Sequence, residues 1–362
     1  MPSLFDSLEL GAINSANRIL MAPLTRGRAT REAVPTPIMA DYYRQRAGAG
    51  LIISEATGIS REGLGWPNAP GLWTDAQVEG WKPITAAVHE GGGKIVAQLW
   101  HMGRLVHSDL GGGQPVSSSA TTAPDFAHTY EGKKPYEPAR EASEADIARI
   151  VRDYAQAARN AIRAGFDGVQ IHGANGYLVD QFLRDGANHR ADRYGGSIDN
   201  RLNFVTEVIE AVAGVIGIER TAIRFSPNVH SQGVEDSDPE ALFTALARRL
   251  EELQVPWIEL REPGPETNFG SKPTAPVSPA MRPLYSGKII VNSDYDGPSA
   301  QARLDAGIVD GIAFGRTFLA NPDLVERIRR QAPLNAPDTS TFYRGGAEGY
   351  TDYPTIKEQA AA

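Results

Sequence analysis

Short apolar runs alternate with longer amphipathic stretches along nearly the whole chain. Each run is brief and almost continuously apolar, which is typical of a strand buried on both faces of a parallel sheet. The pattern predicts strands over residues 18–22, 51–55, 94–98, 167–172, 221–225, 257–261, 288–292 and 311–314. The alternation of these strands with helices indicates βαβ units.

The amphipathic stretches carry recognisable helix signals. The helix between the third and fourth strands is predicted to begin after Ser143, whose hydroxyl can cap it, with Asp146 three residues on. Apolar side chains then recur at helical spacing from Ile147 to Ile162, and Gly165 suits the position just beyond the helix end. Further outer helices are predicted over residues 35–46, 74–90, 200–215, 239–253, 298–306 and 322–330.

Eight strands, each followed by a helix, predict an α/β fold of the (β/α)8 TIM-barrel type, as a single domain over residues 1–362. The alternative is an open, doubly wound sheet. The sequence has no G-x-G-x-x-G after its first strand and no G-x-x-x-x-G-K-[ST], so the usual nucleotide loops of open sheets are missing. This absence favours the barrel.

Two segments lie outside the barrel pattern. Residues 1–16 alternate Leu8, Leu10 and Ile13 around Gly11, which predicts an N-terminal hairpin over the amino-terminal mouth of the barrel. Residues 102–142 are rich in Gly, Ser and Pro and form a long insertion after the third strand. Because long insertions in compact domains are usually lids or binding loops, we expect residues 102–142 to cap the site.

Composition narrows the class of protein. Of the 362 residues, 41% are hydrophobic and 22% charged, as in a soluble globular protein with a sizeable core. A net charge of −8 without a Lys/Arg run argues against a nucleic-acid partner, and the absence of cysteine excludes disulfides and thiolate sites. No signal-peptide pattern or apolar window of about 18 residues occurs, so we expect a cytoplasmic protein with no membrane partner.

Polar residues follow the predicted strands at their carboxyl ends, where barrel enzymes build their active sites. These ends carry Thr25, Arg26, Glu55, Gln98, His101, His172, Arg224, Asn292, Ser293, Gly315 and Arg316. The set is rich in donors and lacks a carboxylate pair or metal-ligand spacing, so we predict no metal and favour a flat, electron-rich cofactor. Backbone amides near the last two strands suit a phosphate. Alternatively, Arg224 is half of a barrel ion pair and Gly315-Arg316 is a simple turn.

The stretch from Gly165 to Tyr177 concentrates the candidate chemistry. His172, Asn175 and Tyr177 follow the end of the fourth predicted strand. An imidazole, an amide and a phenol within six residues can hold one substrate oxygen and deliver a proton. The alternative interpretation is a strand-end loop whose His and Tyr have only structural roles.

Long motifs in order along the chain connect these residues to one family. They are Asn17-Arg18, Met21-Ala22-Pro23-Leu24-Thr25-Arg26, Ser54-Glu55-Ala56-Thr57, Gln98-Leu99-Trp100-His101, His172-Gly173-Ala174-Asn175-Gly176-Tyr177, Tyr194-Gly195-Gly196 and Gly349-Tyr350-Thr351-Asp352-Tyr353-Pro354. With them the sequence resembles the Old Yellow Enzyme family of FMN-dependent ene-reductases over essentially its whole length. It most resembles the bacterial branch of cyclohexenone and N-ethylmaleimide reductases.

For the cofactor, the resemblance implies FMN bound without a covalent link and reduced by NADPH or NADH. Its contacts would be Ala22, Pro23, Leu24, Thr25, Ala56, Gln98, His172 and Arg224 around the ring, and Asn292, Ser293, Gly315 and Arg316 at the phosphate. Thr25 would bind near O4, whereas Gln98 and Arg224 would contact the N1, O2 and N3 edge. The permanent charge of Arg224 would stabilise reduced flavin.

For the substrate, the resemblance implies reduction of an activated C=C bond. His172 and Asn175 would bind the activating oxygen, hydride would pass from flavin N5 to the β-carbon, and Tyr177 would protonate the α-carbon. The pocket would be lined by Trp66, Trp100, Phe269 and Tyr343. The partners would be small molecules: α,β-unsaturated ketones and aldehydes, maleimides and nitroalkenes.

Three positions depart from the family pattern. Asn175 stands where some members have a second His, and both side chains can donate. Gly173 stands where Ala is expected, so we expect a slightly looser loop. The loop after the seventh strand, Val291 to Tyr295, lacks the Gly common in other branches, which leaves its phosphate contacts least determined.

Two other functions remain as alternatives, and the chain is expected to be a monomer or homodimer. A flavin-free barrel lyase or aldolase would need a Schiff-base lysine, but Lys94 and Lys288 fall at strand starts, the wrong end of a barrel. A non-catalytic flavin-binding protein would not need the set His172, Asn175 and Tyr177.

Overall fold

The computed structural model describes residues 1–229, 232–264 and 275–361. In this part of the chain, eight parallel strands close into a barrel. They are β3 (Ile19–Met21), β4 (Ile52–Gly58), β5 (Ile95–Trp100), β10 (Gly168–His172), β11 (Thr221–Phe225), β12 (Trp257–Arg261), β13 (Lys288–Asn292) and β14 (Gly311–Phe314). The predicted barrel is confirmed, and the open-sheet alternative is wrong because β14 pairs with β3 to close the ring.

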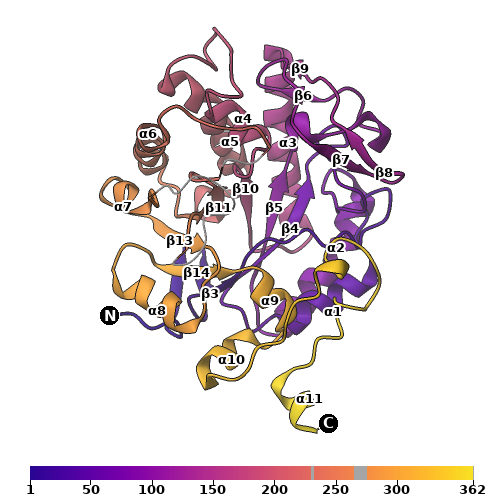
Figure 1. Ribbon diagram of the computed structural model, residues 1–362, viewed down its shortest axis with the longest axis vertical. Coiled ribbons are helices and arrows are strands. Elements are labelled where there is room, and N and C mark those ends of the chain that lie inside the picture. The colour runs from indigo at the N-terminus through magenta and orange to yellow at the C-terminus, as the bar shows by residue number, and fades with distance from the viewer. Residues whose placement is uncertain (230–231, 265–274, 362) are drawn as a thin grey trace.

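Helices alternate with the strands around the outside of the barrel (Figure 1). The predicted ones are α1 (Pro37–Gln45), α2 (Asp75–Glu90), α3 (Glu144–Arg163), α5 (Ile198–Ile216), α6 (Pro239–Glu252), α8 (Gly297–Asp305) and α10 (Leu324–Arg330). The α3 start is capped as predicted, since the Asp146 N–H donates to Ser143 Oγ at 3.1 Å and the Ser143 N–H donates to Asp146 Oδ2 at 3.0 Å. Gly165 follows α3 with a φ of +91°, which suits glycine.

Several short elements were not predicted. They are the helices α4 (Leu178–Leu183), α7 (Ser278–Met281), α9 (Arg316–Ala320) and α11 (Ile356–Ala361), and the 3₁₀ turns η3 (Ile218–Arg220), η4 (Arg282–Leu284) and η5 (Thr339–Thr341). Each has at most six residues, which is too short to establish a helical period in the sequence.

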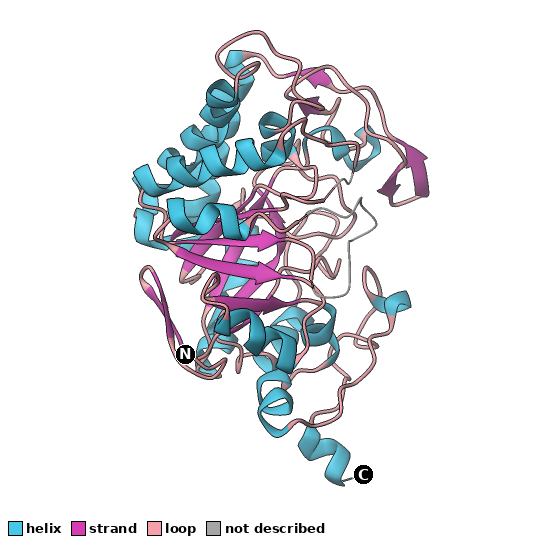
Figure 2. Ribbon diagram, turned by 60° about the vertical axis from the view of Figure 1, so that its left-hand side comes forward, coloured by secondary structure: helices cyan, strands magenta, loops and turns pink. Residues whose placement is uncertain are grey.

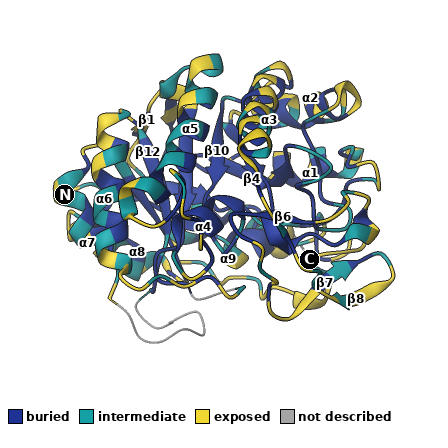
Figure 3. Ribbon diagram, turned by 90° about the horizontal axis from the view of Figure 1, so that it is seen from above, coloured by how far each residue is buried: buried dark blue, intermediate teal, exposed yellow. Residues whose placement is uncertain are grey.

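Burial explains why the strands are almost continuously apolar. Their residues are covered inside by the barrel core and outside by the helices, so every residue of the strands β3, β4 and β5 is buried. Figure 3 shows the strands buried at the centre and the exposed residues on the outer faces of the helices. Among the described residues, no helix is both long enough and apolar enough to cross a bilayer.

The N-terminal hairpin lies where the sequence predicts it. Strands β1 (Leu8–Leu10) and β2 (Ile13–Ser15) pair antiparallel. Their apolar residues Leu8, Leu10 and Ile13 join the core inside the barrel, and the Ala12 N–H donates to the Glu219 carbonyl at 2.8 Å. Figure 2 shows the hairpin beside the starting ends of the barrel strands, so it closes the mouth opposite to the strand ends that carry the polar residues.

The insertion over residues 102–142 has small elements of its own. It contains the 3₁₀ turns η1 (Gly103–Leu105) and η2 (Ser108–Leu110) and the hairpin of β7 (Phe126–Thr129) with β8 (Gly132–Pro135). Strand β6 (Val116–Ser117) pairs with β9 (Arg140–Glu141) and closes the segment on itself. The insertion therefore leaves and rejoins the barrel at neighbouring points.

Candidate active site

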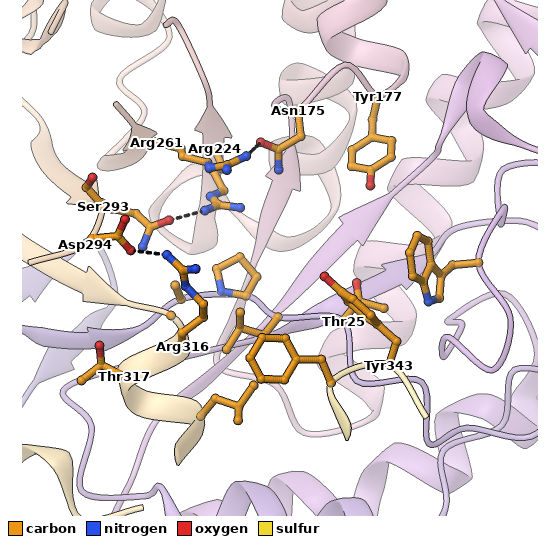
Figure 4. A pocket seen from close by; sticks show the side chains of 18 residues that line it. Thr25, Asn175, Tyr177, Arg224, Arg261, Ser293, Asp294, Arg316, Thr317 and Tyr343 are labelled. Carbon is orange, nitrogen blue, oxygen red and sulfur yellow. Dashed lines mark hydrogen bonds and ion pairs between the residues drawn. The ribbon is translucent and has the colours of Figure 1, made fainter. Parts of the chain in front are cut away.

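A cavity of about 460 Å³ opens at the carboxyl ends of the barrel strands (Figure 4). The residues that line it are Ala22, Pro23, Leu24, Thr25, Trp66, Asn175, Tyr177, Arg224, Arg261, Asn292, Ser293, Asp294, Gly315, Arg316, Thr317, Leu319, Phe342 and Tyr343. They lie in the last residues of β11, β12 and β13, follow β3, β4, β10, β13 and β14, or come from the C-terminal segment. Because the carboxyl ends of all the barrel strands meet at one mouth, residues far apart in sequence surround one cavity. We call this the strand-end rule.

Most of the residues proposed from the sequence line this cavity, but some do not. Ala56, Gln98, Trp100 and His172 are buried and are not among its lining residues. His172 and Trp100 lie directly behind Tyr177, with ring centroids 4.8 Å and 4.9 Å from it. Phe269 lies outside the described residues.

Five lining residues were not predicted: Arg261, Asp294, Thr317, Leu319 and Phe342. Arg261 is the last residue of β12, so the strand-end rule identifies it once it is applied to the sixth strand as well. Thr317 and Leu319 belong to the unpredicted α9. Phe342 lies in a C-terminal segment without a periodic pattern, and no sequence signal places it at the site.

The loop after β10 aims two side chains out of a buried segment. From Gly168 to Arg184, every residue is buried except Asn175 and Tyr177. Asn175 has a φ of +59°, and its N–H donates to Ser226 Oγ at 2.7 Å. The expected loosening of the loop by Gly173 stays a prediction, but a Cβ at this position would lie 3.0 Å from the Arg224 carbonyl oxygen. Glycine instead allows the backbones to approach closely.

The proton position on His172 is fixed by a backbone group. The Ala174 N–H donates to His172 Nδ1 at 3.3 Å, so Nδ1 is the acceptor and the ring proton is on Nε2. Burial lowers the pKa of His172 well below its usual value, and the charges of Arg224 and Arg261 lower it further. His172 is therefore a neutral donor at Nε2.

Tyr177 is kept in its protonated form. Burial raises the pKa of Tyr177 above the ordinary value of about 10, and the nearby phenols of Tyr136 and Tyr343 raise it further. Its ring stands edge-on to His172 and Trp100, at interplanar angles of 85° and 84°. The phenol is therefore held in one orientation and carries its proton through the neutral pH range.

A chain of buried hydrogen bonds and one ion pair runs beneath the cavity from β5 to β13. Gln98 Nε2 donates to Gln170 Oε1 at 2.8 Å, and Gln170 Nε2 donates to Glu259 Oε2 at 2.9 Å. Arg224 Nε lies 3.1 Å from Glu259 Oε1, and Arg224 Nη2 donates to Asn292 Oδ1 at 2.7 Å. The barrel ion pair considered from the sequence is therefore present, and the charge of Arg224 at the cavity is partly balanced by a buried carboxylate.

The opposite end of the cavity is suited to an anion. Among the described lining residues, three arginines accompany one aspartate, and Arg316 pairs with that residue, Asp294, at 2.6 Å. Ser293 Oγ is buried without a hydrogen-bond partner in the described part of the chain. The Asn292 side chain lines the cavity and also connects strands, because its Oδ1 accepts from Arg224 Nη2 and its Nδ2 donates to the Ala313 carbonyl.

These donors fit FMN, which is flat, electron-rich and anionic at its phosphate. The orphaned Ser293 hydroxyl and the Arg316 guanidinium can hold the phosphate, while Thr25 and Arg224 supply donors beside the ring site. No group of three His, Asp or Glu side chains that could hold a metal ion occurs among the residues described.

One wall of the cavity is aromatic. The Trp66 ring lies 5.1 Å from Tyr343 and 4.5 Å from His128 of the insertion, between ring centroids. Tyr343 is 52% exposed, at the rim. The wall is anchored by Arg26, which follows Thr25 and donates from Nε to the Phe342 carbonyl at 3.0 Å. An apolar or π-bearing ligand would find a contact surface here.

Comparison with known proteins gives a consistent family. Residues 3–335 match the model of the NADH:flavin oxidoreductase / NADH oxidase family. An Old Yellow Enzyme homologue from Zymomonas mobilis is 55% identical, with a TM-score of 0.96 over 98% of this chain and 99% of that chain. Morphinone reductase in complex with tetrahydroNAD is 46% identical, with a TM-score of 0.93 over 98% of both chains. A putative 12-oxophytodienoate reductase 3 from Oryza sativa subsp. japonica is 43% identical over 97% of this chain and 92% of the relative.

Proposed function

The chain belongs to the NADH:flavin oxidoreductase / NADH oxidase family, the family of Old Yellow Enzyme, and from this premise we propose that it is an ene-reductase. It is a flavin-dependent oxidoreductase whose cofactor is FMN and whose hydride donor is a nicotinamide. The proposed reaction is reduction of a C=C bond conjugated to a carbonyl or nitro group. The names of the relatives, which include a morphinone and an oxophytodienoate reductase, support activated alkenes as the substrate class.

We propose that Thr25, Arg224, Ser293 and Arg316 hold FMN, with Arg224 near the ring and Ser293 and Arg316 at the phosphate. Bound FMN would supply the hydride for the reaction. Because Arg224 is paired with Glu259, its stabilisation of negative charge on the reduced ring is weaker than that of an isolated cation. Gln98 and Ala56, proposed from the sequence as ring contacts, would act from just beneath the cavity.

His172 and Asn175 would bind the activating oxygen of the substrate. A neutral Nε2–H and an amide N–H are donors, and both would donate to that oxygen as negative charge develops on it. Preorganised donors of this kind stabilise the developing enolate more than the ground-state carbonyl. Trp66, Trp100 and Tyr343 would position the apolar part of the substrate.

Tyr177 would donate a proton to the α-carbon. The α-carbon of an enolate is strongly basic, so a phenol with a raised pKa remains a competent acid. The position of Tyr177 beside His172 is the observation that carries this proposal, because one group binds the oxygen while its neighbour protonates the adjacent carbon.

The two alternative functions have less support. Lys94 Nζ lies 3.1 Å from Asp167 and Lys288 Nζ lies 3.6 Å from Asp310, both before or at the starts of their strands and away from the cavity. Neither lysine is therefore positioned for a Schiff base there. A protein that only stores or senses flavin needs neither a neutral donor at His172 nor a protonated phenol at Tyr177.

The test is to replace the phenol alone. Tyr177→Phe is expected to slow alkene-driven flavin reoxidation at least about 100-fold, a usual size for loss of a general acid, while flavin reduction by NADPH changes less than about threefold. Anaerobic stopped-flow absorbance at the flavin band measures both half-reactions. Equal slowing of the two would remove Tyr177 as the acid.

A cytoplasmic location, a monomeric or homodimeric state, and use of either NADPH or NADH are parts of the same proposal. The family description and the tetrahydroNAD complex of morphinone reductase support NADH, and the use of NADPH stays a prediction. The proposed partners are small molecules, with neither nucleic acid nor membrane among them.

A further inference from the structure

The amide of Asn175 can face the cavity in two ways with opposite consequences. Turned one way it presents N–H donors, and turned by 180° it presents a carbonyl oxygen. Only the donors can stabilise negative charge on a substrate oxygen, whereas the carbonyl would repel it. The orientation of this one amide therefore decides whether Asn175 assists or opposes the proposed reaction.

Arg261 selects between the two orientations. Arg261 Nη1 donates to Asn175 Oδ1 at 2.7 Å, and Figure 4 shows the amide nitrogen turned away from the guanidinium. A guanidinium has five N–H donors and no acceptor, so only the carbonyl oxygen can face it. Turning the amide over would replace a charge-assisted hydrogen bond by N–H groups opposed to N–H groups.

The backbone of Asn175 is already fixed, so the freedom that remains is in its side chain. Its backbone lies in the left-handed region and is held by Ser226 Oγ. Arg261 ends β12, whose register with β11 pairs Glu259 with Arg224 and Leu260 with Phe225. Asn175 follows β10, which pairs with the other edge of β11, so the donor and the amide that it orients are carried by two strands joined through β11.

We propose that Arg261 is a positioning residue, which acts through Asn175 to keep the amide N–H groups facing the substrate oxygen; this rests on the ene-reductase function proposed above. The sequence motifs do not identify this role, because Arg261 becomes relevant only through its distance to Asn175. Burial, with Arg224 nearby, lowers the pKa of Arg261 to about 10, so it remains a cation at neutral pH.

A direct effect of the Arg261 charge and a positioning effect through Asn175 predict different changes in ligand affinity when the two residues are replaced singly and together. If Arg261 acted by its charge on the ligand, its removal would weaken binding whether or not the amide is present. If it acts through Asn175, its removal has no further effect once the amide is gone. A double-mutant cycle with Arg261→Met, Asn175→Ala and the double variant separates these roles.

The measurement is the dissociation constant of 4-chlorophenol for each oxidised holoenzyme. Binding is followed by the long-wavelength absorbance that a phenolate gives when it stacks over flavin, and the absorbance is divided by the concentration of bound flavin. Arg261→Met is expected to weaken binding about tenfold in the parent, the size of one lost charge-assisted hydrogen bond, and less than twofold in the Asn175→Ala background. Equal weakening in both backgrounds would overturn the proposal.

Arg261→Lys provides a second cycle if the methionine variant fails to load FMN. Lysine keeps the charge and a donor. Arg261→Lys is therefore expected to recover at least half of the phenol affinity that Arg261→Met loses, and only when Asn175 is present. Recovery that persists in Asn175→Ala would assign the effect to charge and overturn the positioning role. A parent holoenzyme that binds no phenol and is not reoxidised by cyclohexenone would instead reject the proposed function itself.

Discussion

The groups that would face the substrate are set by neighbours that need not touch it. The backbone N–H of Ala174 assigns the proton of His172 to Nε2, and the guanidinium of Arg261 assigns the amide face of Asn175. Each of these two hydrogen bonds occupies the acceptor atom of the side chain, so the side chain presents its donor to the substrate. The chemistry at the residue scale therefore depends on tautomer and rotamer control as much as on the identity of the residues.

The pKa directions at His172 and Tyr177 predict how activity depends on pH. The neutral form of His172 persists below pH 6.5 and the protonated form of Tyr177 persists above pH 10. The rate constant of enone-driven flavin reoxidation is therefore expected to change less than twofold between about pH 6 and 9. A sigmoidal change centred near pH 6.5 would show that His172 titrates normally and contradict this interpretation.

Folding stability should nevertheless respond to His172 in acid. The unfolded chain binds a proton at this residue below about pH 6.5, whereas the folded chain does not, so the free energy of unfolding falls as pH decreases from that value. Activity per folded molecule and stability are thus expected to separate in this window.

At the residue scale, the residues at the strand ends could be predicted from the sequence, but the hydrogen bonds between their side chains could not. The sequence places Thr25, Asn175, Tyr177 and Arg224 at strand ends, and these residues line the cavity. The bond from Gln98 to Gln170 depends on the register between β5 and β10, which no local pattern specifies.

At the scale of elements, buried arginines hold the C-terminal segment to the barrel, and Arg26 is one of them. Arg26 is fully buried and donates from Nε to the Phe342 carbonyl and from Nη2 to the Gly349 carbonyl, at 3.0 Å and 2.8 Å. Its own N–H donates to Glu55 of β4 at 3.1 Å. Arg26 thereby joins the end of β3, the strand β4 and the segment that forms the aromatic wall.

Replacing Arg26 tests this tie. Arg26→Met leaves the Gly349 carbonyl without its charged donor and the Phe342 carbonyl with Arg28 Nη1 as its charged donor, so the free energy of unfolding is expected to fall by about 2–4 kcal/mol. Urea unfolding followed by circular dichroism measures it. Arg44→Met in α1 is the matched control, because Arg44 is exposed and its one ion pair within the described residues is with Asp41 on the surface. A change below about 0.5 kcal/mol is expected. A similar small loss for both variants would contradict the structural role of Arg26.

Long elements could be predicted from the sequence, whereas short ones could not. The α3 helix has a capping box, twenty residues and a clear apolar face, and its start and end were predicted correctly. The α4 and α9 helices have six and five residues and follow site loops, so their sequences carry no period. Thr317 and Leu319 were missed for this reason.

At the scale of the whole molecule, the two ends of the barrel differ, because one is closed by apolar residues and the other carries the candidate active site. The N-terminal hairpin closes one mouth with apolar residues, including the fully buried Leu10. The opposite mouth is lined by polar strand ends and an aromatic wall that contacts the insertion through His128. The alternation of strands and helices was sufficient to predict the barrel, because eight parallel units close in one direction. The number of subunits depends on surfaces with no such regularity and stays a prediction.

The central claim is that this barrel binds FMN and passes hydride from a nicotinamide to an activated alkene. The most direct measurement is the visible spectrum of the purified protein as NADPH and then cyclohexenone are added without oxygen. We predict a flavin spectrum that bleaches with NADPH and returns with cyclohexenone. A protein that cannot be loaded with FMN, or a reduced flavin that stays bleached in the presence of the enone, would contradict the account.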